Sequence, residues 1–298
     1  IRVQPDDDRR VYLCATDLWA SDDGGVTFKG GISRGIHPDF HAMWIDPNDG
    51  DMIYTGTDGG IHVSHDRAKN WRFINNIPLG EFYNVAVDMK EDYTICGGLQ
   101  DNQNWCGPVR TRFETENWFG GPPPHEGILN ANWLDLGGGD GFHIAIDPTN
   151  PNLVYYESQG ADLFRRDLSS GRDRRIRPSN NEGEKVFRFN WNSPLQLSPH
   201  DPSVLWLGGN HLFRLYDHAE KWEMVSPDLT TDDPAKIATG GSAAETHCTI
   251  VTLSESPVKA GVIWCGTDDG KLWVTRDGGK RWADVTPPGV APWSKITQ

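Results

Sequence analysis

The chain has 298 residues, with 33 Gly, 20 Pro and 13 Trp but only four Met. This composition favours many short strands and tight turns over amphipathic helices, so we expect an all-β protein. The formal net charge of −14 argues against nucleic acid as a partner, because nucleic-acid affinity comes mainly from Lys and Arg side chains that neutralise phosphates.

Two further features of the whole chain bound its context. No apolar run approaches the roughly 20 residues that a spanning helix needs, so we predict no membrane-spanning segment in this stretch. The chain begins at Ile1 within an apparent strand, which indicates a piece of a longer or processed protein. A run of Arg residues between 165 and 177 is typical of a solvated hairpin face, and we assign it no function.

Six copies of a strand–turn–strand signature follow one another along the chain. In each copy an apolar strand ends in a turn rich in Pro, Asp or Asn and is followed by a second apolar strand. The first strands are expected at 1–3, 43–45, 84–87, 143–146, 195–197 and 250–253, and the second at 11–15, 52–56, 93–97, 153–157, 204–208 and 262–266. Four-stranded units repeated every ~40–60 residues favour a β-propeller, because each twisted sheet must bury its faces against its neighbours.

A turn motif of the form Ser-x-Asp-x-Gly-x-Thr-aromatic joins the third and fourth strands of several repeats. Its residues are Ser21, Asp23, Gly25 and Phe28 in the most complete copy, and Asp66, Trp71, Asp277, Gly279 and Trp282 in two others. The Asp accepts local backbone N–H groups, the Gly takes a left-handed conformation and the aromatic ring packs between sheets. We therefore expect a structural role for these residues.

With the stretches 40–47, 97–102, 137–142, 189–194 and 255–257, these repeats resemble BNR/Asp-box β-propellers. The closer resemblance is to sortilin-like (VPS10-related) bacterial propellers described as glycosyl hydrolase BNR-repeat proteins. It covers the whole chain and implies one propeller domain, or most of one, at 1–298, with about six visible blades and seven as the alternative. Residues 293–298 are expected to open a further blade, so more chain or a partner subunit would complete the ring. The resemblance also implies a periplasmic or extracellular location.

Function in a propeller is expected where long loops meet the central channel. Insertions at 107–139, 178–188 and 226–247 lead towards first strands, and the segments before first strands share one face with the turns between second and third strands. That face holds Asp39, His41, Glu81, Tyr83, Asp140, Asn190, Trp191, Glu245 and His247, together with Asp17, Asp58, Gln100, Asp101, Asn102, Gln159, Asn210, His211, Asp268 and Asp269. The face is acidic and rich in amides.

The predicted ligand-binding residues are Asp39, His41, Gln100, Asp101, Asn102, Asp140, Trp191 and His247. Gln100 to Asn102 follow two Gly residues and Asp140 lies in a Gly run, and Gly permits close approach of a ligand. Asp58 and Asp268 follow Gly-Thr and are more simply explained as turn residues. The His and carboxylate residues of the face would suit a cation if they converged, but structural His residues explain the pattern better, so we predict no metal and no cofactor.

No Ser-nucleophile, P-loop or dinucleotide signature is present. The sortilin-like resemblance, with strong structural repetition and no identifiable catalytic pair, implies a binding or scaffold module that takes a protein, peptide or glycan partner on the acidic face. The alternative is a glycoside hydrolase similar to xyloglucan-cleaving BNR propellers, which would need two facing carboxylates. Its candidate residues are the acids Asp101 and Asp140 and the sugar-stacking Trp118, Trp133 and Trp191, although packing within blades is the plainer interpretation of these Trp residues.

The five Cys residues form neither a dense disulfide framework nor a metal-binding pattern. Cys14, Cys96 and Cys265 occupy equivalent places in three repeats. Equivalent positions in separate blades should lie farther apart than the ~4.4–6.8 Å between Cα atoms that a disulfide allows. We expect buried free thiols. Pairing of Cys96 with Cys106 across the segment between them is the alternative.

Overall fold

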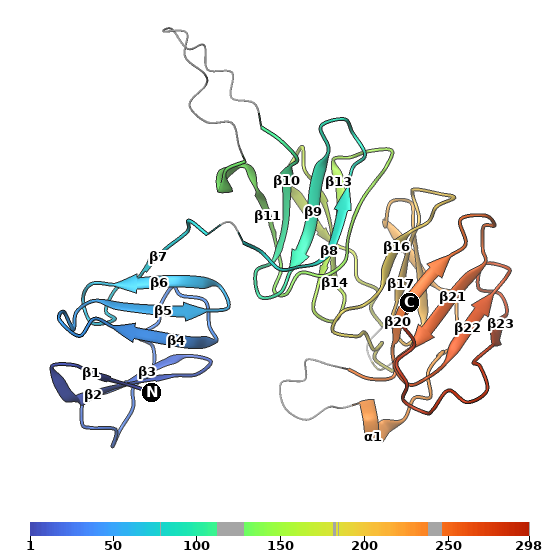
Figure 1. The fold of residues 1–298 in the computed structure, drawn as a ribbon. Coiled ribbons are helices and arrows are strands. Elements are labelled where there is room, and N and C mark those ends of the chain that lie inside the picture. The colour runs from blue at the N-terminus through green and yellow to red at the C-terminus, as the bar shows by residue number, and fades with distance from the viewer. Residues whose placement is uncertain (78, 112–127, 181–182, 184, 238–245, 298) are drawn as a thin grey trace, which may run out of the picture. The chain divides into compact units, whose positions relative to one another are not determined.

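The computed structural model describes residues 1–77, 79–111, 128–180, 183, 185–237 and 246–297. In this part of the chain the regular structure is almost entirely β, and its strands form six antiparallel sheets (Figure 1). The chain divides into two compact units, Ile1–Gly80 and Glu81–Gln298. The predicted all-β fold built from propeller blades is confirmed, and the prediction that 1–298 is one domain stays a prediction.

The first unit contains two blades. Blade 1 consists of β1 (Arg2–Gln4), β2 (Asp7–Cys14) and β3 (Leu18–Ser21), and blade 2 of β4 (Phe40–Ile45), β5 (Ile53–Thr57), β6 (Gly60–Ser64) and β7 (Arg72–Phe73). Blade 1 departs from the predicted four strands, because only a single bridge between Ala20 and Lys29 follows β3. Residues 22–28, which form the turn after β3, contain the left-handed residues Gly24 and Gly25, and no regular strand lies between this turn and β4.

The second unit contains four blades with four strands each. Blade 3 holds β8 (Phe82–Val87), β9 (Thr94–Leu99), β10 (Asn104–Pro108) and β11 (Leu134–Gly137), and blade 4 holds β12 (Ile144–Ile146), β13 (Leu153–Ser158), β14 (Asp162–Asp167) and β15 (Arg172–Arg175). Blade 5 holds β16 (Leu195–Leu197), β17 (Leu205–Gly208), β18 (Leu212–Tyr216) and β19 (Lys221–Met224), and blade 6 holds β20 (Ile250–Glu255), β21 (Ile263–Thr267), β22 (Leu272–Thr275) and β23 (Trp282–Asp284). The six predicted pairs of first and second strands are all present.

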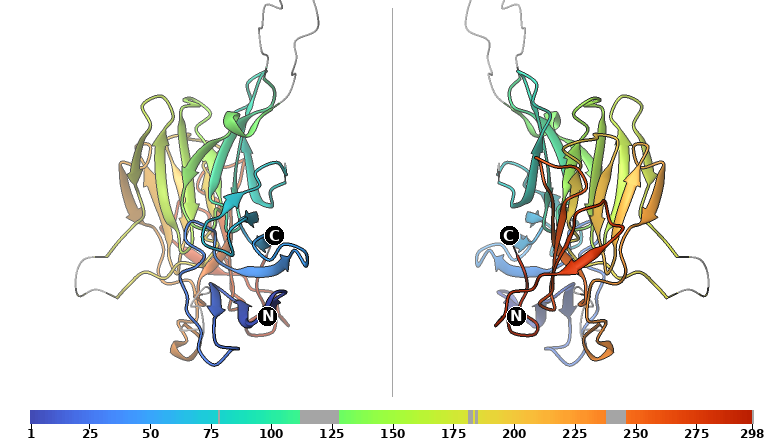
Figure 2. Two further views of the ribbon diagram at one scale, coloured as in Figure 1. Left: turned by 90° about the vertical axis from the view of Figure 1, so that its left-hand side faces the viewer. Right: turned by 90° about the vertical axis from the view of Figure 1, so that its right-hand side faces the viewer.

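Buried apolar layers join consecutive blades of the second unit, whose sheets follow one another in chain order (Figure 2). Val154 and Tyr156 of blade 4 pack towards blade 3, whereas Tyr155 on the opposite face of β13 packs towards blade 5. Successive residues of a strand point to opposite faces, so a strand buried on both sides requires the continuous apolar run seen at 153–156. Each inner blade of this unit is thereby held between two neighbours.

Helical structure is sparse in the described residues. It comprises the 3-10 turn η1 (Asn130–Asn132) and the single turn α1 (Pro234–Ile237). Neither approaches the length that a bilayer crossing would need, and the described part of the chain holds no helix able to span a membrane.

Three of the Ser/Thr-x-Asp turns share one set of hydrogen bonds. In each, the hydroxyl of the first residue donates to the Asp carboxylate and accepts a backbone N–H from four residues on, as between Ser21, Asp23 and Gly25. The Asp also accepts a backbone N–H and a side-chain group of the residue four positions later, which is Thr27, Asn70 or Arg281. These side-chain bonds, followed by the backbone bonds, lower the pKa of Asp23, Asp66 and Asp277 to about 2.

The Trp residues that close two of these turns reach the preceding blade. The indole N–H of Trp71 donates to the backbone carbonyl of Ile32 at 2.9 Å, and that of Trp282 donates to Val225 at 3.0 Å. Ile32 follows blade 1 and Val225 follows β19 of blade 5. Each indole therefore contributes a directed bond across a blade boundary in addition to its apolar packing.

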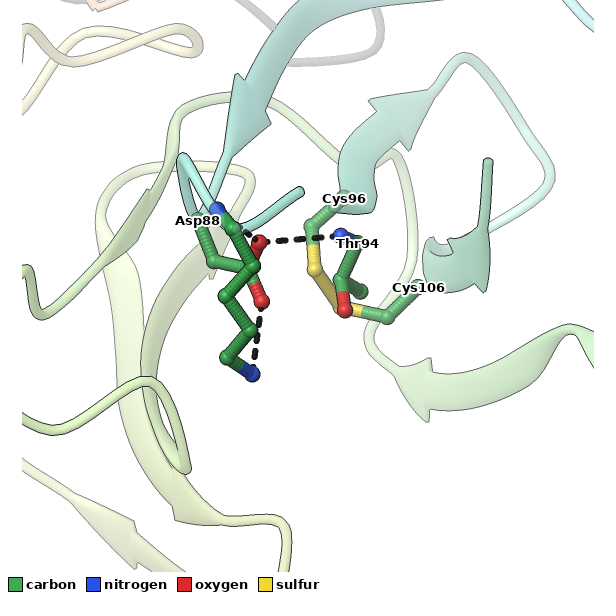
Figure 3. The surroundings of a disulfide bond; sticks show 5 residues. Asp88, Thr94, Cys96 and Cys106 are labelled. Atoms are coloured by element: carbon green, nitrogen blue, oxygen red, sulfur yellow. Dashed lines mark hydrogen bonds and ion pairs between the residues drawn. A yellow bond between two sulfur atoms is a disulfide. The ribbon is translucent and has the colours of Figure 1, made fainter. Parts of the chain in front are cut away.

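Cys96 and Cys106 form a disulfide between β9 and β10 (Figure 3). The predicted free thiol at Cys96 is therefore wrong, and the pairing alternative is confirmed. The two residues are direct cross-strand partners with Cα atoms 4.1 Å apart, because residues 97–105 form a hairpin instead of an open loop. Cys14, Cys248 and Cys265 carry free thiols, of which Cys14 is half-buried and the other two are buried.

Near this disulfide, the loop between β8 and β9 is closed by the Asp88 carboxylate, which accepts the Thr94 N–H at 3.0 Å and pairs with Lys90 at 2.9 Å (Figure 3).

Two predicted loop features differ in the structure. Residues 293–297 form no strand of a further blade, because the N–H groups of Trp293 and Ile296 bond back to Asp269 and Thr267 in blade 6. The insertion 107–139 contains the outer strand β11 and so does not lead directly into a first strand.

Candidate functional site

One edge of the second unit gathers the segments that lead into first strands and the turns between second and third strands. Between blades 3 and 4, the Gln103 N–H bonds to the Gly139 carbonyl at 3.0 Å and the Gly141 N–H to the Leu99 carbonyl at 2.9 Å. Between blades 4 and 5, the Gly160 N–H bonds to the Trp191 carbonyl at 3.1 Å. Backbone hydrogen bonds therefore connect the loops of neighbouring blades, which makes this edge a continuous surface of fixed shape.

The Gly residues predicted to admit a ligand instead admit backbone. A Cβ atom on Gly98 would lie 2.2 Å from the carbonyl carbon of Gly141, and one on Gly141 would lie 2.3 Å from the Gln103 carbonyl oxygen. These separations are far below van der Waals contact. The Gly residues on both sides are needed so that the loops of blades 3 and 4 can touch.

Asp140 anchors this junction. Its side chain is only 7% exposed, and one carboxylate oxygen accepts the Asp101 N–H at 2.7 Å while the other accepts the Gln159 amide at 2.8 Å. Asp101 has a left-handed backbone, with φ of 57°. A single carboxylate thus holds the left-handed turn of blade 3 against the corresponding turn of blade 4.

Three aromatic rings from three blades lie beside Asp140. Tyr83 stacks on Phe142 with ring centroids 5.0 Å apart, and Trp191 meets Phe142 edge-on at 5.0 Å and Tyr83 at 6.1 Å. Phe142 is fully buried, whereas Tyr83 and Trp191 are partly exposed. The Tyr83 hydroxyl donates to the Gln100 amide oxygen at 2.9 Å, so the rings are tied to the same turn that Asp140 anchors.

The contacts continue from Trp191 into blade 6. Asn190 donates to the Thr249 hydroxyl at 3.1 Å, and this hydroxyl donates to the Asp268 carboxylate at 2.8 Å. The Asp268 carboxylate also lies 3.8 Å from Nδ1 of His247. Trp293 flanks His247, with ring centroids 6.3 Å apart. A row of polar and aromatic side chains therefore crosses all four blades of the second unit.

The electrostatics of the row are set by burial and by carboxylates. Burial raises the pKa of the Tyr83 hydroxyl, and the charges of Asp140, Glu81 and Asp101 raise it further. Burial also raises the pKa of Asp268, partly offset by the hydrogen bonds from Thr249. Three carboxylates therefore lie near enough to Tyr83 to disfavour its ionisation.

A buried acidic side chain belongs to the strand whose backbone is bonded to Phe142. Glu157 of β13 accepts the Phe142 N–H through its backbone carbonyl at 3.1 Å, and its carboxyl is completely buried. Neither carboxyl oxygen has a hydrogen-bond partner within the described residues. Burial raises the pKa of Glu157 well above its usual range and lowers that of His143, on the facing segment, to about 4.

The first unit carries a separate group of the predicted residues. The His41 ring is paired with the Asp58 carboxylate, and the Asp39 N–H bonds to the Thr16 carbonyl at 2.9 Å. Asp39 is left-handed, with φ of 65°. Here too the segment before a first strand meets the turn between second and third strands.

The structure therefore divides the predicted ligand-binding residues. Gln100, Asp101, Asn102, Asp140 and Trp191 come together at the junction of blades 3 to 5, His247 lies in blade 6, and Asp39 and His41 belong to the first unit. Glu245 and Trp118 lie outside the described residues. Trp133, offered as a sugar-stacking platform, packs against Gly107 in mid-strand and lies 6.2 Å from the Phe82 ring, so it belongs to the blade and not to the row.

Sequence reasoning missed Phe142 and gave no specific role to Tyr83 and Gln159. Phe142 follows Gly141, and an aromatic residue two positions after Asp140 was the available signal. Among the described residues, no group of three or more His, Cys, Asp or Glu side chains has the arrangement of a metal site.

Comparison with known proteins gives similarity of fold. No family model matches the sequence, and no curated protein matches it. A GH74 enzyme from Niastella koreensis is 13% identical, with 98% of this chain and 50% of that chain covered and a TM-score of 0.34. The extracellular domain of a putative one-component system from B. thetaiotaomicron is 15% identical, with 96% and 34% covered and a TM-score of 0.45.

YCF48 from Cyanidioschyzon merolae is also similar, with 15% identity, 97% of this chain and 85% of that chain covered, and a TM-score of 0.38. The chain thus spans half or less of the first two proteins. At these identities and TM-scores the similarity assigns neither a family nor an activity.

Proposed function

We propose that the chain is a binding module of the BNR-like, sortilin-like class, which takes a protein, peptide or glycan partner on the row of side chains that crosses blades 3 to 6. The observation that carries the proposal is the partly exposed pair Tyr83 and Trp191, held over buried Phe142 and beside the fixed Asp140. Aromatic faces next to oriented amides and carboxylates are typical of sites that bind extended polar ligands.

Among the described residues, the alternative from the sequence, a glycoside hydrolase, is less well supported. Both carboxylate oxygens of Asp140 are occupied by the Asp101 N–H and the Gln159 amide, which suits an anchor of loop structure better than a general acid. Trp133 contributes to blade packing. We therefore do not propose a hydrolase site with two facing acids and a row of sugar-stacking side chains.

We also propose that the protein acts in an oxidising compartment outside the cytoplasm. The Cys96–Cys106 disulfide supports this, because structural disulfides persist in secreted and periplasmic proteins and are rare in the cytosol. Mass spectrometry of alkylated protein from host-cell fractions should find this pair oxidised in the exported fraction. Recovery from the cytoplasm with both thiols reduced would contradict the proposal.

The binding role can be tested with two immobilised panels, a phage-displayed 12-residue peptide library and an array of plant and bacterial glycans. Trp191→Ala should lower the affinity for captured ligands at least about tenfold, because aromatic anchors contribute about 2 kcal/mol or more at interfaces. The control is Trp264→Ala, which removes an exposed Trp on β21.

Tyr83→Phe provides a milder second variant, since it removes only the hydroxyl that donates to Gln100. Thermal melting of each variant shows whether the fold is kept. Absence of any ligand from both panels, or equal loss in the Trp191 and Trp264 variants, would overturn the proposed function.

A further inference from the structure

A hollow lies at the junction of blades 5 and 6, and its lining residues are separate from the row that crosses blades 3 to 6. It has a volume of about 410 Å³ and is lined by residues 224–227 at the end of β19 and by residues of blade 6 that include Trp273, Lys280 and Trp282. Ligand sites typically occupy ~300–1,000 Å³, so the hollow has room for side chains of a partner.

The two indole rings of the lining are held in place before any ligand arrives. The ring N–H of Trp273 donates to the Leu229 carbonyl at 2.7 Å, and that of Trp282 donates to the Val225 carbonyl at 3.0 Å. Both rings pack on the apolar layer between blades 5 and 6 and stay partly exposed. Because both ring N–H groups are already used, each indole offers apolar surface to the hollow, and a fixed ring loses little conformational entropy when a ligand packs on it.

The blade 5 side of the hollow adds exposed apolar side chains. Met224 is 49% exposed, and Pro227 is exposed as well. The Ser226 hydroxyl, also in the lining, donates to the Pro227 carbonyl at 2.7 Å and accepts the Leu212 N–H at 2.8 Å. Met and Trp are enriched at protein interfaces, and a flexible Met side chain adapts to its partner. The lining therefore suits apolar side chains of a protein segment better than the hydroxyl groups of a sugar.

Two cations of the turn that lines the hollow have no carboxylate partner among the described residues. They are Arg276 and Lys280, both exposed, in a turn at 275–282 that contains a single Asp. An anionic group that entered the hollow could therefore pair with Lys280 without displacing another carboxylate. The carboxylates of segments 221–229 and 271–284 all have basic partners, namely Glu223 with Arg214 at 3.1 Å, Asp228 with Arg188 at 2.7 Å, Asp277 with Arg281 at 2.8 Å and Asp284 with Lys271 at 3.1 Å.

The equivalent place between blades 1 and 2 is also hollow but has a different chemistry. Its volume is about 450 Å³, and it is lined in part by Lys69, which holds the place of Lys280 in the turn of blade 2. Among the described residues its lining contains no Trp or Met, and the lining residues Arg10 and Asp22 pair with each other at 2.5 Å. A hollow beside the turn is thus common to both junctions, whereas the apolar lining is particular to blades 5 and 6.

We propose that the hollow between blades 5 and 6 binds an apolar segment of a partner protein that carries an Asp or Glu side chain. Its apolar side chains pack on Trp273, Trp282 and Met224, and its carboxylate pairs with Lys280. The net charge of −14 repels a strongly acidic partner over a distance, which favours one carboxylate within an apolar segment over an acidic run. This site is independent of the proposed function, because it shares no residue with the row.

The test begins with peptides selected from a phage-displayed 12-residue library on the unmodified chain. Lys280→Gln removes the charge, and its matched control is Lys69→Gln, at the same position of the turn in blade 2. Met224→Ala removes an exposed apolar side chain, and Met89→Ala, in the loop between β8 and β9, is its control. Each selected peptide is resynthesised with its Asp and Glu residues replaced one at a time by Asn and Gln. Affinities are measured by fluorescence anisotropy, and thermal melting shows whether each variant keeps its fold.

Peptides of this site should combine apolar residues with an Asp or Glu. At 50 mM NaCl, Lys280→Gln should lower their affinity about two- to fivefold, with a smaller difference at 300 mM, because the pair is exposed to solvent. Replacement of the carboxylate by its amide should cost a similar factor on the unmodified chain and nothing further on Lys280→Gln. Met224→Ala should cost about threefold or more, whereas both controls and Trp191→Ala should bind as the unmodified chain does.

The outcomes separate this inference from the proposed function. Peptides that all lose affinity on Trp191→Ala, yet are indifferent to Lys280→Gln and Met224→Ala, would overturn this site and keep the proposed one. Peptides that depend on Met224 but are indifferent to Lys280→Gln and to the amide replacements would overturn the acidic ligand. Failure to capture any peptide would also overturn this inference, while a glycan ligand lost on Trp191→Ala would still support the proposed function.

Discussion

Asp140 gives the most direct test of how the site is built. Replacement by Ala would leave the Asp101 N–H and the Gln159 amide without their acceptor at a position where the side chain is 7% exposed. A hydrogen bond to a charged group contributes about 1.5–3 kcal/mol, and part of that is recovered by hydration of the exposed Gln159. We expect Asp140→Ala to lower the free energy of unfolding by about 2–4 kcal/mol.

Asp140→Asn separates geometry from charge. The Asn carbonyl oxygen can still accept the Asp101 N–H, and rotation of the Gln159 amide presents its oxygen to the new NH₂ group. This variant should therefore lose no more than about 1 kcal/mol. Urea unfolding at pH 7 measures both, with Glu91→Ala, an exposed carboxylate in the loop before β9, as the control. Equal stability of Asp140→Ala and the unmodified chain, or equal losses in the Ala and Asn variants, would refute the anchoring role.

Three other changes have definite expected outcomes. The buried guanidinium of Arg188 pairs with Asp228 at 2.7 Å, so Arg188→Ala should cost about 3–5 kcal/mol in urea unfolding, and a loss below about 1 kcal/mol would contradict the pairing. The folded pKa of Asp66 is about 2, below that of an unfolded Asp, so its stabilisation is present above pH ~4 and is lost as the pH falls towards 2. Asp66→Asn should flatten the acid limb of stability against pH, and an unchanged limb would exclude this turn as its source. The raised pKa of Glu157 has the opposite sign, because its stabilisation is complete below pH ~4.3 and is lost as the pH rises through the folded value. Glu157→Gln should therefore melt higher than the unmodified chain at pH 8 but not at pH 4, and equal melting temperatures at pH 8 would place the carboxyl in a hydrated setting.

The first and second strands of every blade could be predicted from sequence because their signals are local. The run 153–157 and the turn at 147–152 specify β12, β13 and their connection without reference to the rest of the chain. The outer strands depend more on their neighbours. After the turn at 21–28 the motif is complete but blade 1 has no fourth strand, whereas a less complete copy, with Asp66 and Trp71, precedes the short strand β7.

The candidate site could be predicted only as a set of loops. Alternation and turn residues place Gln100, Asp140 and Trp191 at one edge, but the bond from Asp101 N–H to Asp140 depends on the approach of two backbones at Gly98 and Gly141. The equivalence of repeats predicts a free thiol at Cys96, whereas its pairing with Cys106 follows from the cross-strand register of the hairpin that the Gly-rich segment after Cys96 forms. The contact at Gly98 and Gly141 joins segments that are distant in the chain, and such contacts have no signature in a single sequence.

The bonds from Trp71 to Ile32 and from Trp282 to Val225 hold two blades together, but their donor belongs to the turn motif of one blade. A gene duplication that copied the second blade alone would carry the indole but not the carbonyl it is aimed at. The segment that can be copied or transplanted without losing this bond therefore runs from the end of one blade through the closing turn of the next, so its boundaries differ from those of the sheets. To lengthen or circularise this scaffold, the chain should be divided at those boundaries.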